Sequence, residues 1–277
     1  MPWLQSQSSG TAAGSVVARA GADPSVWLCL LGGFRLLTGG QPVPVRSGGK
    51  TEALLVHLGL AGLRGVPRDV LLRAIWPHSE PSLAGQALNS LVHSLKRLLG
   101  EALGGAEPVV PTAGRYRLNA AAGVAVDVVQ FQALVAEGER LQREHQLTAA
   151  AAVYERAVRL YGGDLSLAAG SSGRTVLERE RLRATYRRVL IRLADDAFAS
   201  GEFEASLGHA LTLLAHDPCR EDAHRLVMRC HVRLGERSQA LRHYETVQEI
   251  LHAEFDAAPE PATTALFEQI RLHPGAV

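Results

Sequence analysis

The chain has 277 residues, of which 47% are hydrophobic and 21% charged, a composition typical of folded globular proteins. This length suggests two domains, and no apolar run approaches the ~20 residues of a membrane-spanning helix. Cys29, Cys219 and Cys230 provide neither a disulfide framework nor a C-x-x-C pair, so we expect a reducing, cytoplasmic location. Residues 1–25 lack a secretory signal pattern, and we interpret them as a flexible leader.

Charge is distributed unevenly, although the net charge is only +1. Residues 25–120 contain 10 lysines and arginines against 5 acidic residues, whereas residues 121–277 contain 18 against 22. A basic first part and an acidic second part are typical of a DNA-binding module joined to a protein-binding module.

The basic part, residues 26–120, begins with features of short strands. An apolar run at residues 26–37 is followed by Gly39-Gly40 and by weak alternation over residues 42–46. Helical spacing then starts near Thr51 and stops at Gly62, and further helices are expected over residues 67–76 and 82–99. Residues 109–110 and 116–118 flank a turn and predict a β-hairpin.

The helix expected over residues 82–99 has an apolar face and a polar face. The polar face consists of Gln86, Asn89, Ser90, His93, Lys96 and Arg97. In a major groove, Asn and Gln can pair with adenine and Arg and Lys with guanine. On the pattern alone, an ordinary amphipathic helix with a solvated face is the better interpretation, because such faces are common on surface helices.

The second part of the chain, residues 126–273, has helical periodicity throughout and contains an internal repeat. Residues 201–218 align with residues 235–252 at an offset of 34. The offset aligns Gly201 with Gly235, Ser206 with Ala240, Leu207 with Leu241, Ala210 with Tyr244, and Leu213 with Val247. An earlier copy at residues 145–161 is out of phase because of an insertion around residues 162–174. This period is typical of tetratricopeptide repeats, which stack into a superhelix that binds other proteins.

Motifs of catalysis, cofactor binding and metal binding are missing from the sequence. Gly49-Lys50-Thr51 imitates the end of a phosphate-binding loop, but Pro44 stands where that motif requires glycine. His224, Cys230 and His231 have no third and fourth partner at zinc spacing. We therefore expect no enzymatic activity, no catalytic residues, no cofactor and no metal.

A series of motifs runs through the first part: LLGGFRL, K-x-x-ALLVHL, V-x-R-D-x-L-x-x-x-IWP, LNSLVHSLKRLLG and G-R-Y-R-L, in that order. This series resembles the N-terminal domain of the SARP family, the actinobacterial antibiotic regulatory proteins. In the second part, Val126-Asp127, Phe131 and residues 216–245 resemble the bacterial transcriptional activator domain that follows in that family. The resemblance implies a mainly α fold with a small β portion: an OmpR-type winged helix-turn-helix domain at residues 26–120 and an all-α tetratricopeptide-like domain at residues 126–273.

The resemblance also implies a function. It indicates a sequence-specific activator of an antibiotic gene cluster, which binds direct repeats in double-stranded promoter DNA as a homodimer and recruits RNA polymerase through its sigma factor. The implied DNA contacts are the polar face Gln86, Asn89, Ser90, His93, Lys96 and Arg97, the wing residue Arg115, and Lys50, Arg64 and Arg68 on the phosphate backbone. Only two firm positive charges lie on the reading helix, so we expect weak binding by a single protomer. The alternative is a protein-interaction adaptor whose winged helix no longer binds DNA.

Overall fold

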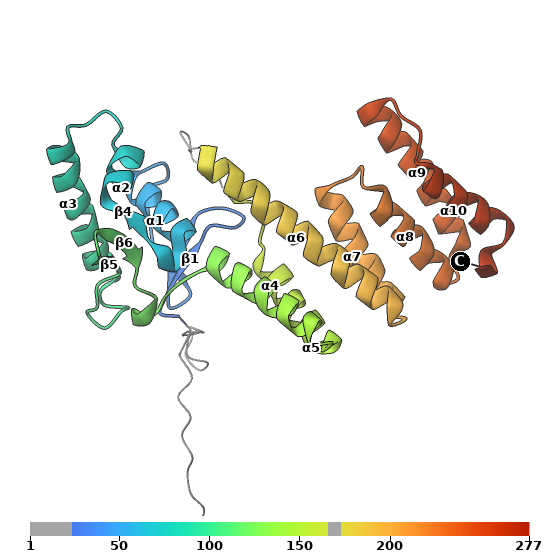
Figure 1. The fold of residues 1–277 in the computed structure, drawn as a ribbon, viewed down its shortest axis with the longest axis horizontal. Coiled ribbons are helices and arrows are strands. Elements are labelled where there is room, and N and C mark those ends of the chain that lie inside the picture. Colours follow the sequence, from blue (N-terminus) through green and yellow to red (C-terminus); the bar gives the residue numbers. More distant parts are fainter. Residues whose placement is uncertain (1–23, 166–172, 277) are drawn as a thin grey trace, which may run out of the picture.

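The computed structural model describes residues 24–165 and 173–276. The predicted leader lies outside this range except for its last two residues. Within the described ranges the chain is mainly helical, and all of its strands lie between Val26 and Val126 (Figure 1). No helix in those ranges is long and apolar enough to span a membrane.

Two small sheets frame the first part of the chain. The first has the strand order β3-β2-β1-β7, made of Gln41–Pro42, Arg35–Thr38, Val26–Cys29 and Val124–Val126. The second has the order β4-β6-β5, made of Val66–Pro67, Arg115–Leu118 and Val109–Thr112. The predicted hairpin is therefore present as β5 and β6. The strand expected as far as residue 46 ends at Pro42. Val43 still donates to the carbonyl of Leu36 at 2.8 Å, but Pro44 supplies no N–H with which a ladder could continue.

Helices α1 (Lys50–Ala61), α2 (Arg68–Ile75) and α3 (Pro81–Leu99) lie between β3 and β5 in sequence, and β4 separates α1 from α2. Each begins and ends within one residue or two of the expected boundary. Pro81 suits the first turn of α3 because its fixed φ is helical and the first N–H groups of a helix lack partners anyway. Ala84, Leu88, Leu95 and Leu99 bury one side of α3 in the core.

Strand β7 lies at the boundary predicted between the two parts. It pairs in parallel with β1, with Val26 opposite Val124 and Leu28 opposite Val126, and α4 (Asp127–Arg143) begins at the next residue. Leu31 also forms an isolated bridge with Leu165, which follows α5. The first sheet is therefore completed by residues that adjoin the helical part.

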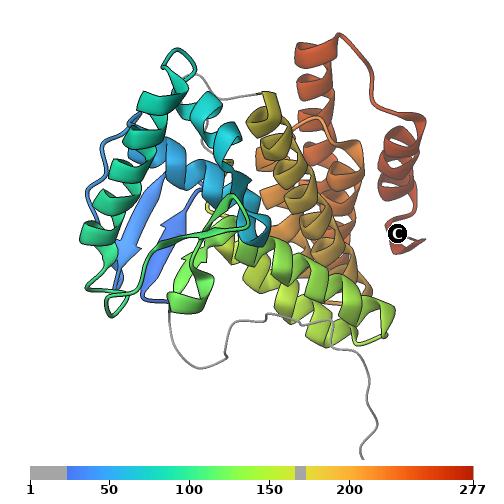
Figure 2. The ribbon, with the colours of Figure 1, turned by 60° about the vertical axis from the view of Figure 1, so that its left-hand side comes forward.

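The helical part consists of consecutive helix pairs: α4 with α5 (Leu147–Leu160), α6 (Gly173–Ala199) with α7 (Phe203–His216), and α8 (Glu221–Arg233) with α9 (Arg237–Phe255). Helix α10 (Pro261–Leu272) follows, and Figures 1 and 2 show the pairs stacked side by side. The aligned repeat positions are equivalent in the fold. Ser206 and Ala240 are completely buried, as are Leu213 and Val247. The small residues allow neighbouring helices to approach, and the large ones fill the adjoining grooves.

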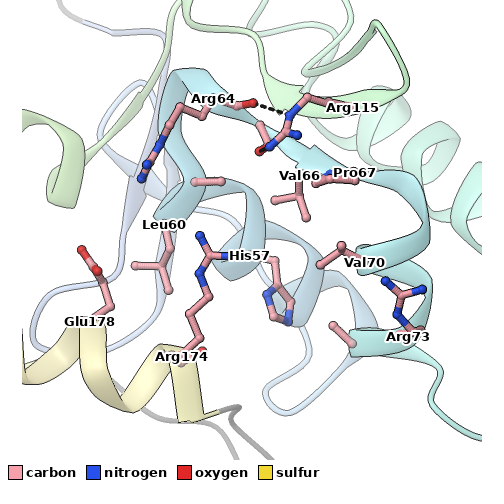
Figure 3. Close-up of a pocket in the computed structure, with 14 residues that line it drawn as sticks. His57, Leu60, Arg64, Val66, Pro67, Val70, Arg73, Arg115, Arg174 and Glu178 are labelled. Atoms are coloured by element: carbon pink, nitrogen blue, oxygen red, sulfur yellow. Dashed lines mark hydrogen bonds between the residues drawn. The ribbon is translucent and has the colours of Figure 1, made fainter.

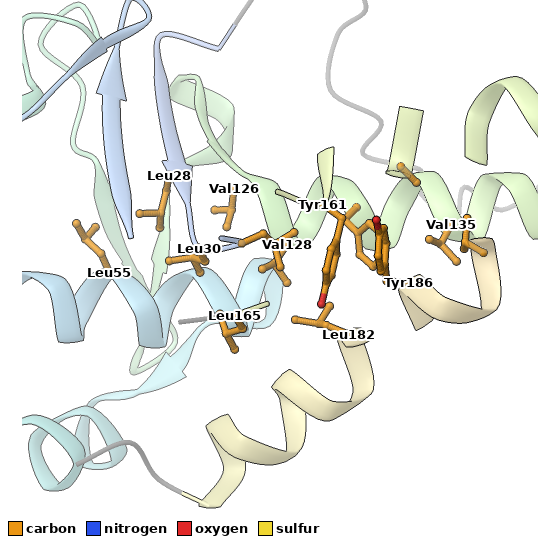
Figure 4. Close-up of a cluster of buried hydrophobic side chains, with 14 of the residues drawn as sticks. Leu28, Leu30, Leu55, Val126, Val128, Val135, Tyr161, Leu165, Leu182 and Tyr186 are labelled. Atoms are coloured by element: carbon orange, nitrogen blue, oxygen red, sulfur yellow. The ribbon is translucent and has the colours of Figure 1, made fainter. Parts of the chain in front are cut away.

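One continuous apolar core joins the two parts of the chain. Figure 4 shows it running from Leu28 and Leu55 in the first part to Tyr161 and Tyr186 in the helical part. The rings of Tyr161 and Tyr186 are stacked with centroids 4.0 Å apart, and Phe131 lies 5.3 Å from Tyr161. Because burial of aromatic side chains contributes strongly to stability, this contact fixes α4, α5 and α6 against each other.

Candidate nucleic-acid interface

The polar face of α3 is uncovered. In both views α3 forms the edge of the molecule farthest from the helix pairs (Figures 1 and 2). Gln86, Asn89, Ser90, His93 and Arg97 are all exposed on it. Their spacing of three and four residues aligns them along one side of a 19-residue helix. The structure thus brings these five predicted contacts together on one accessible surface.

Lys96, on the same helix, is engaged by a neighbouring acidic side chain. Its Nζ lies 2.5 Å from Oε1 of Glu107, and the two side chains are 44% and 45% exposed. Glu107 precedes β5 and reaches back to the last turns of α3. The ion pair compensates one of the two firm positive charges of the helix and leaves the Arg97 guanidinium as the uncompensated one.

Arg115 is held against the protein backbone. Its Nε donates to the carbonyl of Arg64 at 2.8 Å, and its Nη2 donates to the carbonyl of Gly65 at 2.9 Å. Gly65 has a φ of +62°, and a side chain there would collide with the carbonyl of Tyr116. Arg115 therefore fastens the wing to the turn before β4, a role that the sequence did not indicate.

The remaining predicted cations differ in their surroundings. Lys50 donates from Nζ to the carbonyl of Ile75 at 2.5 Å, where it satisfies the C-terminal end of α2. The Arg68 guanidinium lies over Gly85 at the start of α3, where any larger residue would displace it. Arg64 and Arg68 are exposed, and neither has an ion-pair partner among the described residues.

The contacts of three of these residues could not be seen in the sequence. The partner of Lys96 is 11 residues further along the chain, beyond the end of α3, where helical spacing no longer predicts neighbours. The partners of Arg115 and Lys50 are backbone carbonyls, which no residue type identifies. Within the described ranges, no group of three or more His, Cys, Asp or Glu residues is placed to hold a metal ion.

Comparison with known proteins identifies the helical part. Residues 126–271 match the bacterial transcriptional activator domain. The regulatory protein AfsR of Streptomyces griseus is 26% identical over 242 residues, which are 86% of this chain and 23% of AfsR. The transcriptional regulatory protein MoaR1 of Mycobacterium tuberculosis is 26% identical over 263 residues, which are 92% of this chain and 82% of MoaR1. The chain thus spans about a quarter of the length of AfsR and most of MoaR1.

A solved structure supports the fold of both parts. Mycobacterium tuberculosis EmbR, in complex with a low affinity phosphopeptide, superposes with a TM-score of 0.69 at 24% identity. The superposition covers 90% of this chain and 65% of that one. The expected mainly α fold, with a winged helix followed by an all-α part, is confirmed. The chain belongs to the bacterial transcriptional activator domain family and, with its winged helix, to the SARP-type transcriptional regulators.

Proposed function

We propose that this protein is a sequence-specific DNA-binding transcriptional activator that reads the major groove with α3. The observation that carries the proposal is the uncovered row of polar side chains along this helix. An α-helix fits the width of the B-DNA major groove, and its exposed side can then reach base edges. No other described element shields this row from a duplex.

The side chains on α3 suit base recognition. Gln86 and Asn89 each carry an amide that can donate to and accept from one adenine edge. Arg97 can pair with guanine or with a phosphate, and Arg68, over the start of α3, is placed for the backbone. Arg64 is a further phosphate contact in this proposal. Lys50, Lys96 and Arg115 would have to leave internal partners before they could contact DNA.

The small number of free cations has a consequence for affinity. Non-specific binding strengthens with each phosphate that a protein neutralises, so one protomer with few free arginines binds weakly. We therefore propose two protomers on direct repeats, spaced by about one helical turn so that both lie on one face of the duplex. The stacked helix pairs offer the surface that would contact RNA polymerase, through its sigma factor, at the promoter of an antibiotic gene cluster.

The internal contacts of Lys50, Lys96 and Arg115 also support a second candidate function. A winged helix with so much of its positive charge engaged could serve only as a structural part of a protein-interaction adaptor. In that case the helix pairs would be the binding surface, and α3 would be an ordinary solvated helix.

A gel-shift experiment with the full chain and promoter DNA from the neighbouring gene cluster separates these functions. At low salt we expect a shift that weakens steeply as salt rises. Arg97→Ala should weaken binding by about tenfold, in line with the loss of one base or phosphate contact. Arg156→Ala, at an exposed position of α5, is the matched control and should leave binding unchanged. No shift at low salt would refute DNA binding and favour the adaptor.

A further inference from the structure

A cavity of about 480 Å³ lies where the winged helix meets α6. Its walls come from α1, from the turn before β4, from α2, from the wing and from the first turns of α6 (Figure 3). The volume is within the range of sites that hold small organic molecules. Residues from both parts of the chain thus enclose a single site.

The interior of the cavity is apolar. Leu60 of α1, Val66 of β4 and Val70 of α2 line it, and the imidazole of His57 points into it (Figure 3). Burial lowers the pKa of His57, and the nearby charge of Arg174 lowers it further. At neutral pH the imidazole is therefore uncharged, and it can donate or accept one hydrogen bond beside an apolar body.

The lining of the cavity carries an excess of positive charge. It includes Arg64, Arg73, Arg115 and Arg174, and Arg174 extends from α6 into the space (Figure 3). Arg73 is paired with Asp69 at 2.6 Å. Among the described residues, Arg64 and Arg174 have no ion-pair partner, and Arg115 contacts only backbone carbonyls. Glu178 is the acidic residue of the lining, and it already accepts from Gln132 at 3.2 Å and lies 3.5 Å from Arg181.

We propose that this cavity binds a small organic anion, with its carboxylate, phosphate or sulfonate group between Arg174 and the arginines of the wing side and its apolar body against Leu60, Val66 and Val70. Guanidinium groups suit such heads because their paired N–H donors match two oxygens of the anion. The three lining guanidinium groups without an acidic partner repel one another across this apolar space, and an anion would offset that repulsion. The uncharged imidazole of His57 can form a hydrogen bond with a polar atom of the ligand between its anionic group and its apolar body.

Occupancy would link the two parts of the chain. Arg115 belongs to the wing and Arg174 to α6, so an anion held by both joins the winged helix to the helix pairs. A ligand that binds one arrangement of this junction more tightly shifts the population toward it. An effect on DNA affinity rests on the proposed function, whereas binding of the anion does not.

A fluorescence titration of the full chain with 8-anilinonaphthalene-1-sulfonate, an aromatic sulfonate, tests the site. We expect saturable binding at one site per chain, weakened about tenfold by Arg174→Ala, as for loss of a charge-assisted contact. The uncharged N-phenyl-1-naphthylamine lacks the anionic group, so it should bind the wild type at least about tenfold more weakly than the sulfonate does. Arg156→Ala should titrate like the wild type.

Three results would overturn the proposal: no saturable binding, an unchanged titration for Arg174→Ala, or equal binding of the uncharged analogue. A gel shift repeated with saturating sulfonate then measures the link to DNA. A chain that binds the sulfonate but never shifts DNA refutes the proposed function and leaves the anion site standing. A chain that shifts DNA but does not bind the sulfonate refutes the anion site and leaves the proposed function standing.

Discussion

The carboxylate of Asp127 accepts a hydrogen bond of 2.7 Å from the backbone N–H of Leu30, 97 residues earlier in the chain. The N–H of Leu31 donates to the same oxygen at 2.8 Å, and the N–H of Val128 donates to the other oxygen at 2.7 Å. Burial raises the pKa of Asp127, and the three N–H donors and Arg35 oppose that rise. One side chain therefore starts α4 and also satisfies the backbone beyond the end of β1.

Asp127→Ala should lower the free energy of unfolding by about 3 kcal/mol, because it leaves buried N–H groups without an acceptor. Asp127→Asn keeps one carbonyl oxygen for Leu30 and Leu31, so we expect a loss of about 1 kcal/mol. Urea unfolding followed by circular dichroism measures both. Equal losses for the two variants would show that the hydrogen bonds of Asp127 do not account for its contribution.

The ion pair of Lys96 gives a test of charge on α3, the proposed DNA-reading helix. Glu107→Gln removes the negative charge and should release Lys96 toward DNA, with binding about threefold tighter at low salt and a steeper salt dependence. Glu101→Gln is the matched control, since Glu101 is exposed near the end of α3 and has no ion-pair partner among the described residues. Gel shifts at two salt concentrations compare them. An equal gain in both variants would indicate a general charge effect and not the release of Lys96.

The features that sequence reasoning found are those encoded locally. The period of α3 and the 34-residue repeat depend on residues three, four and 34 apart, and each recurrence marks a face that must be buried. Polar residues on α3 were placed correctly on the exposed side for the same reason. Leu98 is an exception to this pattern, because its apolar side chain is 42% exposed.

The features that sequence reasoning missed depend on partners that are distant in the sequence or that are backbone groups, which no residue type identifies. Strand β7 has only three residues and exists because β1, about 100 residues earlier, offers it an edge. The resemblance assigns Arg115 to DNA, which stays a prediction, whereas its partners in the structure are carbonyls of another turn that the sequence did not indicate. The junction cavity is assembled from α1, α2, the wing and α6, so no single segment carries its pattern.

A histidine pair between α8 and α9 should make stability depend on pH. The Nε2–H of His224 donates to the carbonyl of Pro218 at 2.7 Å, so its bare Nδ1 accepts from Nε2 of His243 at 2.9 Å. Burial, with the nearby His224 and His231, lowers the pKa of His243 to about 4, from an ordinary value of 6.5. His231 itself contacts Glu236, and Glu221 and Asp222 act on His224 in the opposite sense to burial.

The direction of the change in stability with pH depends on which state, folded or unfolded, binds the proton at the higher pH. As the pH falls below 6.5 the unfolded chain protonates His243 while the folded chain does not until about 4, so stability is lost across that interval. Between pH 7.5 and 4.5, the free energy of unfolding of His243→Gln should fall by about 2 kcal/mol less than that of the wild type. His252→Gln, at a side chain that is 77% exposed, should follow the wild type. An unchanged loss in His243→Gln would contradict this assignment.

The turns within the helix pairs share one backbone geometry but not one residue. Gly201 and Gly235 both have a φ of +80°, and His145 occupies the equivalent place in the first pair with a φ of +59°. In each turn the next residue donates back to the helix: Gln146 to Leu141, Glu202 to Ala197, and Glu236 to His231. This is the Schellman arrangement, which favours glycine because a side chain is strained at positive φ.

His145→Gly should therefore raise the free energy of unfolding by about 1 kcal/mol, and Gly235→Ala should lower it by a similar amount. Nothing lies within 4 Å of the position that a new side chain at Gly235 would take, so backbone strain alone sets the effect. Gly208→Ala, inside α7 and equally open, is the control with the opposite sign, because alanine favours a helix interior. Thermal and urea unfolding of the three variants would contradict the argument if both glycine-to-alanine changes moved stability in the same direction.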